Sequence, residues 1–385
     1  MAQPRRVALI HDFLLDLRGA ERVFLALCDI YPEAPIYTPV YDEEGTEGRF
    51  SDRDIRTSFL QKLRPSARTF RGLLPFYPSA VESFDLSGYD LIVSSSSAWA
   101  HAVIYDEAAV HVSYCHNPFR YVWNDRDATL AQRDPITRAA LRMLFRRWRQ
   151  WDWIAAQRVN RYVTNSRTTQ ARIRAYFGRE STVVHPPVDT SRFTPGAHGE
   201  HYLVLSELMP HKRIDMAVQA FNQMKRPLVV VGDGPDMRRL RRLAGATVTF
   251  TGRVSDEDAA RLLQTSRALV VTGAEEFGIA AVEAQAAGRP AIAPSRGGAL
   301  ETVRDGITGK LWDGGVADLV RAVEGFDVDA VDPGACVENA KRFDTKVFSG
   351  AFPREVERAL KDSEHRGPEH RPTPRPRFAW SPSRR

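Results

Sequence analysis

The chain has 385 residues, of which 43% are hydrophobic and 26% are charged, a balance typical of a soluble globular protein. This length favours two domains of roughly 150 to 200 residues, and no apolar run approaches the roughly 20 residues of a membrane-spanning helix. The three cysteines are too widely spaced for a disulfide framework or a zinc site, and the N-terminus does not resemble a signal peptide, so we expect a cytoplasmic protein. The net charge of +6 favours an anionic partner: a phosphate-bearing substrate, an acidic membrane surface or nucleic acid.

Strands and helices alternate in the first half of the chain, as in a βα repeat. Runs of Val, Leu and Ile end in small or polar residues, which fits strands of a parallel sheet covered on both faces. In such a sheet the functional groups lie at the carboxyl ends of the strands. We predict strands at residues 5–13, 89–96, 109–117 and 161–166, and helices at residues 21–31 and 146–159. These elements form a first Rossmann-like domain, residues 1–190.

A stretch rich in Pro and Gly, residues 185–201, leads into a second βα series. This series predicts a Rossmann-like domain over residues 191–345, with strands at 202–207, 226–234, 247–252, 267–273 and 290–295, and helices at 213–224 and 257–266. We expect a C-terminal helix at 346–362 that packs back on the first domain, and a disordered basic tail at 363–385. The predicted fold is therefore α/β, with two facing, doubly wound domains and a cleft between them.

The most informative segment is residues 273–311, in which Glu275 and Glu283 bracket seven residues. Gly278 would let backbone amides approach a ligand, and the helix that follows would point its N-terminus at a negatively charged group. Glu275 could then accept hydrogen bonds from sugar hydroxyls, and Glu283 from a ribose diol. The alternative is purely structural: Glu275 caps the helix and Glu283 forms a surface or interdomain salt bridge.

This segment resembles the family-4 retaining glycosyltransferases of the GT-B fold, whose E-x7-E motif ends in an EA-(small)-G-P helix and strand. The resemblance continues in order through residues 11–23, 84–96, 114–124, 163–178, 183–193, 209–221 and 229–240. Within the family, the chain looks most similar to bacterial mannosyltransferase-type enzymes that build surface polysaccharides. The resemblance implies transfer of a hexose, with mannose from GDP-mannose as the best guess, to a saccharide or lipid-linked acceptor. It implies a nucleotide sugar as co-substrate, with neither a metal nor another cofactor.

On the donor side, the resemblance assigns Glu275 to the sugar and Glu283 to the ribose. It gives Lys212 the task of neutralising the diphosphate as charge develops on the leaving group. Backbone groups complete this site: Phe277, Gly278 and Ile279 offer amides, Arg253 and Val254 frame the base, and Gly19, with Arg18 and Ala20, lies in a loop facing the diphosphate. Glu207 departs from the pattern, because many relatives carry an arginine there, and a carboxylate repels a diphosphate unless it turns away or pairs with a base such as Arg213.

In the first domain, His116 follows a predicted strand, where similar enzymes place a histidine that contacts the donor sugar or positions the acceptor. Asn117, Arg120 and Tyr121 would line the same edge on the acceptor side. A core histidine bonded to backbone is the alternative for His116, and His101 is left without a role. We therefore assign His116, Lys212 and Glu275 as the catalytic set.

Two other function classes stay open. A non-catalytic nucleotide-sugar-binding relative is the main alternative. Glu207 replaces a phosphate-binding arginine, and the loop at Gly19 has fewer glycines than is common in the family, so both would weaken binding of the diphosphate. A dehydrogenase or epimerase is disfavoured, because the G-x-G-x-x-G spacing does not follow any predicted strand.

Two basic, aromatic stretches, residues 57–78 and 138–154, could lie on an anionic bilayer, which suits a lipid-linked acceptor and a peripheral position on the inner face of the membrane. The alternative for residues 138–154 is a packing helix with a solvated basic face. Nucleic-acid binding is not expected, since the chain has no DNA- or RNA-reading motif.

Overall fold

The computed structural model describes residues 5–67, 69–131 and 133–365. The chain divides into two compact units by its internal contacts. Unit 1 runs to Val163 and also includes Arg174–Ser181 and the chain from Pro353 onward, whereas unit 2 comprises Thr164–Ile173 and Thr182–Phe352. The domain boundary at residue 190 stays a prediction.

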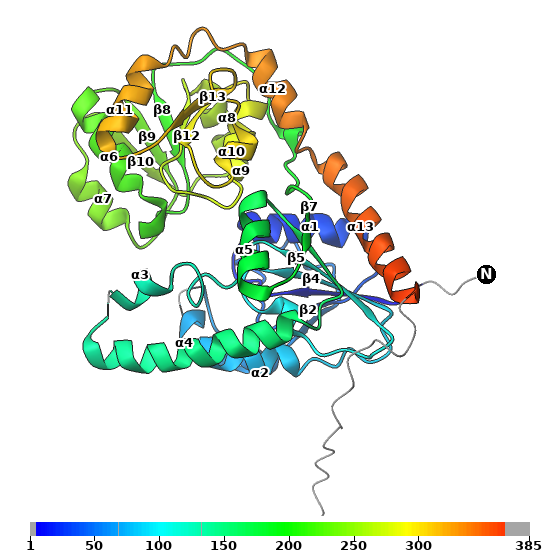
Figure 1. Ribbon diagram of the computed structural model, residues 1–385. Coiled ribbons are helices and arrows are strands. Elements are labelled where there is room, and N and C mark those ends of the chain that lie inside the picture. The colour runs from blue at the N-terminus through cyan, green and yellow to red at the C-terminus, as the bar shows by residue number, and fades with distance from the viewer. Residues whose placement is uncertain (1–4, 68, 132, 366–385) are drawn as a thin grey trace, which may run out of the picture. The chain divides into compact units, whose positions relative to one another are not determined.

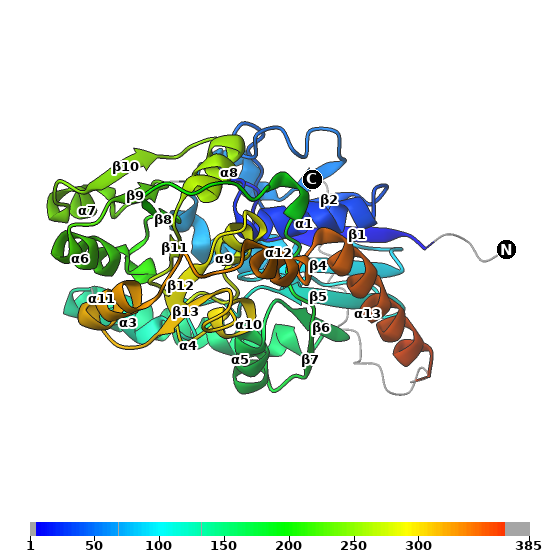
Figure 2. The same cartoon turned by 90° about the horizontal axis from the view of Figure 1, so that it is seen from above.

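The first sheet has seven strands in the order β3-β2-β1-β4-β5-β6-β7, of which Figure 2 labels all but β3. The strands are β1 Val7–His11, β2 Ile36–Thr38, β3 Ile55–Thr57, β4 Leu91–Ser96, β5 Val110–Cys115, β6 Arg161–Thr164 and β7 Ser181–Val183. The helices of this part are α1 Gly19–Ile30, α2 Tyr77–Glu82, α3 Arg126–Ala131, α4 Pro135–Ala156 and α5 Arg167–Phe177. Short 3-10 turns are η1 Phe59–Leu63, η2 Phe70–Phe76 and η3 Ala100–Ala102. The pairings of β1 with β2 and β4, of β2 with β3 and of β4 with β5 are all parallel.

The second sheet has six strands in the order β10-β9-β8-β11-β12-β13, all paired in parallel. The strands are β8 Tyr202–Leu205, β9 Leu228–Val231, β10 Val248–Gly252, β11 Leu269–Val270, β12 Ala291–Pro294 and β13 Gly309–Trp312. The helices are α6 Ile214–Met224, α7 Met237–Leu243, α8 Asp256–Thr265, α9 Ile279–Ala286, α10 Ala299–Thr302, α11 Val316–Gly325 and α12 Pro333–Lys341, with 3-10 turns η4 Thr190–Arg192 and η5 Pro210–Lys212.

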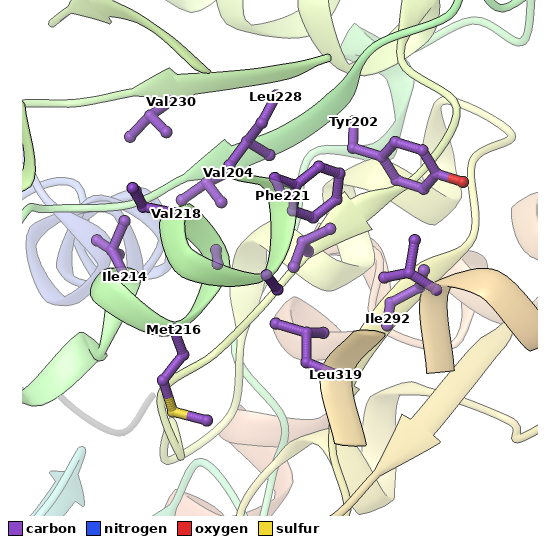
Figure 3. Close-up of a cluster of buried hydrophobic side chains, with 14 of the residues drawn as sticks. Tyr202, Val204, Ile214, Met216, Val218, Phe221, Leu228, Val230, Ile292 and Leu319 are labelled. Carbon is purple, nitrogen blue, oxygen red and sulfur yellow. The ribbon is translucent and has the colours of Figure 1, made fainter. Parts of the chain in front are cut away.

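Each face of the second sheet carries its own apolar core. Alternate strand residues point to opposite faces, because the side-chain period of a strand is two. Tyr202, Val204 and Val230 thus join α6, α7 and α11 in one cluster, drawn in Figure 3, whereas Leu203 and Val231 join α8, α9 and α10 in another. Figure 1 shows these two sets of helices on opposite sides of the strands. In the first sheet, for which burial on both faces was predicted, β4 and β5 are buried at every residue.

Both sheets reverse their strand order at one point, between β1 and β4 in the first and between β8 and β11 in the second. In open α/β sheets, ligands bind outside the carboxyl ends of the strands at such a reversal. The segments that follow β8 and β11 contain Lys212 and Glu275.

The C-terminal helix α13 runs from Thr345 to His365, three residues beyond its predicted end. Its part from Pro353 belongs to unit 1, where Glu355 accepts a hydrogen bond from Arg161 of β6 at 2.8 Å. The rest of the predicted basic tail, residues 366–385, lies outside the described residues. No helix in the described part of the chain is both long enough and apolar enough to cross a bilayer.

Candidate functional site

Lys212 and Glu275 meet at the strand reversal of the second sheet. Lys212 ends η5, just after β8, and Glu275 lies in the segment between β11 and α9. Nζ of Lys212 donates to Oε1 of Glu275 at 2.9 Å, and both side chains are about one-fifth exposed. The two charged groups predicted for one ligand, 63 residues apart in sequence, are therefore in direct contact.

The backbone around this ion pair is packed too closely for side chains. A Cβ on Gly273 would lie 2.9 Å from Cα of Lys212, so only glycine fits there without displacing the lysine. The hydroxyl of Thr272 donates to the Lys212 carbonyl at 2.9 Å. These contacts fix the position of the Lys212 backbone against the end of β11.

A second close approach fixes the Glu275 side of the pair. The amide of Gly298, at the start of α10, donates to the Glu275 carbonyl at 2.9 Å. Gly297 has a φ of +67°, and a Cβ on Gly298 would lie 2.2 Å from Cα of Phe277. The loop after β12 therefore lies directly on the backbone of residues 275–277.

The residues next to Glu275 are tied to neighbouring elements of unit 2. Nη1 of Arg172 donates to Oε1 of Glu276 at 2.9 Å, and the ring of His185 stacks on Phe277 with centroids 5.4 Å apart. Burial lowers the pKa of His185 to about 4, and the charges of Arg342 and Arg167 act in the same direction. The imidazole therefore stays neutral near pH 7 and packs as an aromatic ring.

The remaining E-x7-E residues lie at the beginning of α9. Gly278 is the N-cap with a φ of +91°, and Ile279 is the first helical residue, whose amide has no intrahelical acceptor. The Phe277 side chain is buried in the core, so only its backbone could meet a ligand. Glu283 lies on α9 and is partly exposed. These positions fit the predicted backbone contacts, and their roles stay predictions.

The segment from β8 to α6 contains the departure at Glu207. Glu207 is partly exposed, and its carbonyl accepts from the amide of Met209 at 2.8 Å. Arg213, proposed above as a partner for Glu207, donates instead to Asp215 at 3.3 Å. Arg253 follows β10 and is exposed.

Val254, for which the family resemblance implies a backbone contact with the base, lies directly after Arg253. It is partly buried and packs against the core shared by α8 and α9.

In unit 1, the His116 imidazole is 9% exposed and lies just after the end of β5. Its Nε2 is 2.9 Å from Oγ of Ser95 on β4, and the ring of Tyr114 meets it edge-on with centroids 5.1 Å apart. Its backbone amide donates to the carbonyl of Ser96 at 2.8 Å. The predicted position at the carboxyl end of a strand is therefore correct.

The three residues assigned to the acceptor side differ in their surroundings. Asn117 is buried, and its amide group donates to Asn124 at 3.2 Å. Arg120 lies 3.7 Å from Asp125, and the Tyr121 ring packs edge-on against the buried Phe119. The side chains of Asn117 and Tyr121 thus make contacts within the protein.

His101, to which the sequence assigned no role, belongs to the core. Its Nε2 lies 3.2 Å from Oδ1 of Asp152, and both side chains are almost completely buried. Nδ1 of the same ring bonds Oγ of Ser96 at 3.2 Å, and Trp123 donates to the other oxygen of Asp152 at 2.6 Å. This chain of polar groups joins β4, η3 and α4.

The predicted loop around Gly19 needs a correction. Gly19 and Ala20 form the first turn of α1, and the connection from β1 ends at Arg18, the N-cap. The Arg18 amide donates to the Glu21 carboxylate at 3.0 Å, which begins the helix one residue after the cap. The binding role predicted for Gly19 stays a prediction.

Asp12, one residue after β1, was not among the predicted site residues. Its buried carboxylate accepts hydrogen bonds from the amides of Ala98, Trp99 and Ala100 at 2.8, 2.7 and 2.6 Å, and from that of Ser97. In the sequence, the signal for this network of hydrogen bonds is an acidic residue directly after the carboxyl end of an apolar strand.

No cluster of three or more His, Cys, Asp or Glu side chains suited to a metal ion occurs among residues 5–67, 69–131 and 133–365.

Two family models match consecutive parts of the chain. The model described as Glycosyltransferase Family 4 matches residues 17–192, and the model described as Glycosyl transferases group 1 matches residues 193–343.

Curated relatives match about half of the chain. A GDP-mannose-dependent alpha-(1-6)-phosphatidylinositol monomannoside mannosyltransferase of Mycolicibacterium smegmatis is 32% identical over 197 residues, 42% of this chain and 50% of that protein. A protein of the same description from Mycobacterium tuberculosis is 36% identical over 189 residues, 40% of this chain and 48% of that protein. A D-inositol 3-phosphate glycosyltransferase of Mycobacterium leprae is 30% identical over 212 residues, 47% of this chain and 49% of that protein. The chain thus spans about half the length of the curated relatives it matches.

Solved structures of similar fold cover almost the whole chain. Sucrose-phosphate synthase from Thermosynechococcus elongatus has a TM-score of 0.71 at 18% identity and covers 93% of this chain and 100% of its own. Anabaena HepE in complex with UDP-glucose has a TM-score of 0.68 at 18% identity and covers 92% and 100%. These likenesses show the GT-B fold. With two matching family models that together span residues 17–343, the chain belongs to family 4 of the GT-B glycosyltransferases.

Proposed function

We propose that the protein is a retaining hexosyltransferase that uses a nucleotide sugar as donor. The observation that carries this proposal is the contact of Lys212 with Glu275 at the strand reversal of the second sheet, 2.9 Å between Nζ and Oε1. A cation that can neutralise a diphosphate and a carboxylate that can accept sugar hydroxyls are thereby held within reach of one ligand.

In this mechanism the nucleoside diphosphate leaves ahead of acceptor attack on the same face of the sugar, and the transition state resembles an oxocarbenium ion. Lys212 stabilises the charge that develops on the leaving diphosphate, and the first amides of α9 support it. Glu275 positions the sugar, and Glu283 binds the ribose. Since these groups supply the electrostatic stabilisation, we infer that transfer does not require a metal.

The donor is proposed to be GDP-mannose. The curated mannosyltransferases of Mycolicibacterium and Mycobacterium, which match 40% to 42% of the chain, are described as GDP-mannose-dependent. Their description also names a phosphatidylinositol monomannoside, which supports a lipid-linked saccharide as acceptor. Unit 1 would supply the acceptor side, with His116 as its polar group.

A peripheral position on an anionic membrane follows from a lipid-linked acceptor. The surface of unit 1 supports it, because α4 exposes Ile136, Met143, Trp153 and Ile154 among arginines, and η1 and η2 expose Phe59, Leu63 and Phe76. Apolar groups interleaved with cations favour the interface of an anionic bilayer.

The test is transfer from labelled GDP-mannose to a lipid extract, measured as labelled glycolipid. We expect Lys212→Ala to lower kcat at least a hundredfold, because a cation at the leaving group is worth roughly 3 kcal/mol or more in a transition state. Lys310→Ala is the matched control, since Lys310 also pairs with a carboxylate in unit 2, Asp305, at 3.1 Å.

Equal loss in the Lys212→Ala and Lys310→Ala variants would contradict the assignment of Lys212. No transfer by the wild-type protein, together with tight binding of the donor, would favour the alternative of a non-catalytic nucleotide-sugar-binding relative.

A further inference from the structure

Three consecutive serines at the end of β4 each contact a different histidine. Ser94 Oγ is 2.8 Å from Nε2 of His111, and Ser96 Oγ is 3.2 Å from Nδ1 of His101. Ser95, between them, points to the opposite face of the strand, since side chains alternate. Its Oγ is 2.9 Å from Nε2 of His116.

His111 and His101 are structural, whereas His116 is the histidine with a proposed role in transfer. Burial holds the pKa of His111 well below its ordinary value, and the nearby His101 acts in the same direction, so His111 stays neutral inside the protein. His101 is committed to the buried Asp152. Ser95 therefore differs from its two neighbours, because it orients a side chain of the candidate site.

The His116 ring contacts two buried groups, the hydroxyl of Ser95 and the ring of Tyr114. Ser95 and Tyr114 are both 0% exposed, and they face each other in the register of β4 and β5. The amide of His116 donates to the carbonyl of Ser96, so the backbone of His116 is attached to β4 as well. Backbone and ring are thus fixed to the same strand end by separate hydrogen bonds.

We propose that Ser95 is the positioning residue of His116: its hydroxyl bonds Nε2 and fixes the orientation of the imidazole. A serine hydroxyl both donates and accepts, so it can bond Nε2 in either tautomer, and the bond fixes the direction in which the ring points. Ser95 acts through His116 and does not itself touch the substrate. The inference rests on the role of His116 proposed above.

The first test is spectroscopic and does not depend on activity. In the full chain labelled with 15N-histidine, His116 should give one set of ring-nitrogen resonances, from a single orientation of the ring. Ser95→Ala should shift the Nε2 resonance of His116, and Ser94→Ala should shift that of His111 and leave His116 unchanged. Two sets of His116 resonances in the wild-type protein would overturn the proposal, and this measurement does not require any variant.

The second test is kinetic. Ser95→Ala should lower kcat roughly tenfold with little change in the KM for the donor, the effect of losing one hydrogen bond that orients a reacting group. Ser95→Thr keeps the hydroxyl and should restore most of kcat, whereas Ser94→Ala should retain wild-type kcat. A kcat for Ser95→Ala equal to that of Ser94→Ala would overturn the proposal.

His116→Ala separates the two levels of the argument. If this variant keeps wild-type transfer, the proposed role of His116 fails, and Ser95 orients a histidine without function. If it loses transfer while Ser95→Ala does not, the inference about Ser95 alone is wrong.

Discussion

Asp12 lies directly after β1, and its side chain is buried. Its buried carboxylate accepts from four consecutive amides, those of residues 97–100. Asp12→Asn replaces one acceptor oxygen by a donor that faces two amides. We expect a loss of roughly 2 to 4 kcal/mol in the free energy of unfolding, measured by urea denaturation, because buried donors lose their partners.

Asp54→Asn is the control for Asp12→Asn, since Asp54 also lies in unit 1 but forms an exposed pair with Arg56 at 2.7 Å. Exposed pairs contribute about 0 to 1 kcal/mol, so this variant should be nearly neutral. Equal effects of the two substitutions would show that the four amides do not depend on Asp12.

His185 makes the stability of unit 2 depend on pH. Burial lowers its folded-state pKa to about 4, aided by Arg342 and Arg167, and the acidic group facing it is Glu301, 3.8 Å from Nε2. Since an unfolded histidine has a pKa of about 6.5, its contribution is complete above that pH and is lost as the pH falls toward 4. We expect roughly 1 to 2 kcal/mol less stability at pH 5 than at pH 7 from this group.

The measurement compares urea denaturation of the wild-type protein and of His185→Phe at both pH values. Phenylalanine keeps an aromatic ring against Phe277 and does not titrate. The variant should therefore lose less stability between pH 7 and pH 5 than the wild-type protein, and identical losses would contradict the assignment to His185.

Residues with local sequence signals could be predicted, and residues with distant partners could not. Lys212 and Glu275 stand in recognisable motifs next to strands, so each can be predicted without knowledge of its partner. Asp12 accepts hydrogen bonds from amides 85 to 88 residues away, and Ser95 contacts a histidine 21 residues away. Nothing in the neighbouring sequence indicates such partners.

At the scale of elements, α4 has two chemically different faces. Phe145 and Trp148 are buried in an aromatic core, whereas Ile136 is 83% and Met143 62% exposed. The helix carries five arginines, and Asp152 near its end is its one acidic residue. The inner face of this segment therefore packs against the core, and contact of its outer face with a membrane stays a prediction.

We expect the protein to bind vesicles that contain anionic phosphatidylglycerol, and to bind pure phosphatidylcholine vesicles at least tenfold more weakly, with the difference falling as salt increases. Replacing Ile136 and Met143 by aspartate should reduce binding at least tenfold in a sedimentation assay. Val347→Asp, at an apolar position that is 50% exposed on α13, is the control. Equal binding by all three proteins would exclude α4 as the contact.

Strand and helix types were predictable from hydrophobic periodicity, but element ends depend on single contacts. The strands expected at 202–207, 226–234 and 247–252 correspond to β8, β9 and β10 with shorter bounds. The start of α1 was misplaced by two residues, because a Glu21 side chain that accepts the Arg18 amide moves the cap to Arg18. A hydropathy pattern does not predict this hydrogen bond between the Glu21 side chain and the backbone of the N-cap residue.

For the whole molecule, the βα alternation in the sequence was enough to predict two doubly wound sheets. The strand orders, β3-β2-β1-β4-β5-β6-β7 and β10-β9-β8-β11-β12-β13, were not predictable, because crossovers depend on long-range pairing. Because the strand order reverses between β8 and β11, the segments that follow these two strands bring Lys212 and Glu275 into contact. The central claim is therefore that unit 2 binds a nucleotide sugar through this pair.

The most direct measurement of that claim is a thermal-shift panel with GDP-mannose, UDP-glucose, dTDP-sugars and the free nucleotides, with and without EDTA. A ligand that binds only the folded state raises Tm. At a ligand concentration of a hundred times Kd, it adds about 2.7 kcal/mol to the free energy of unfolding. We predict a selective rise with GDP-mannose that EDTA does not change and that Lys212→Ala abolishes while Lys310→Ala retains it. No shift with any sugar nucleotide, or an equal shift in the Lys212→Ala variant, would contradict the account.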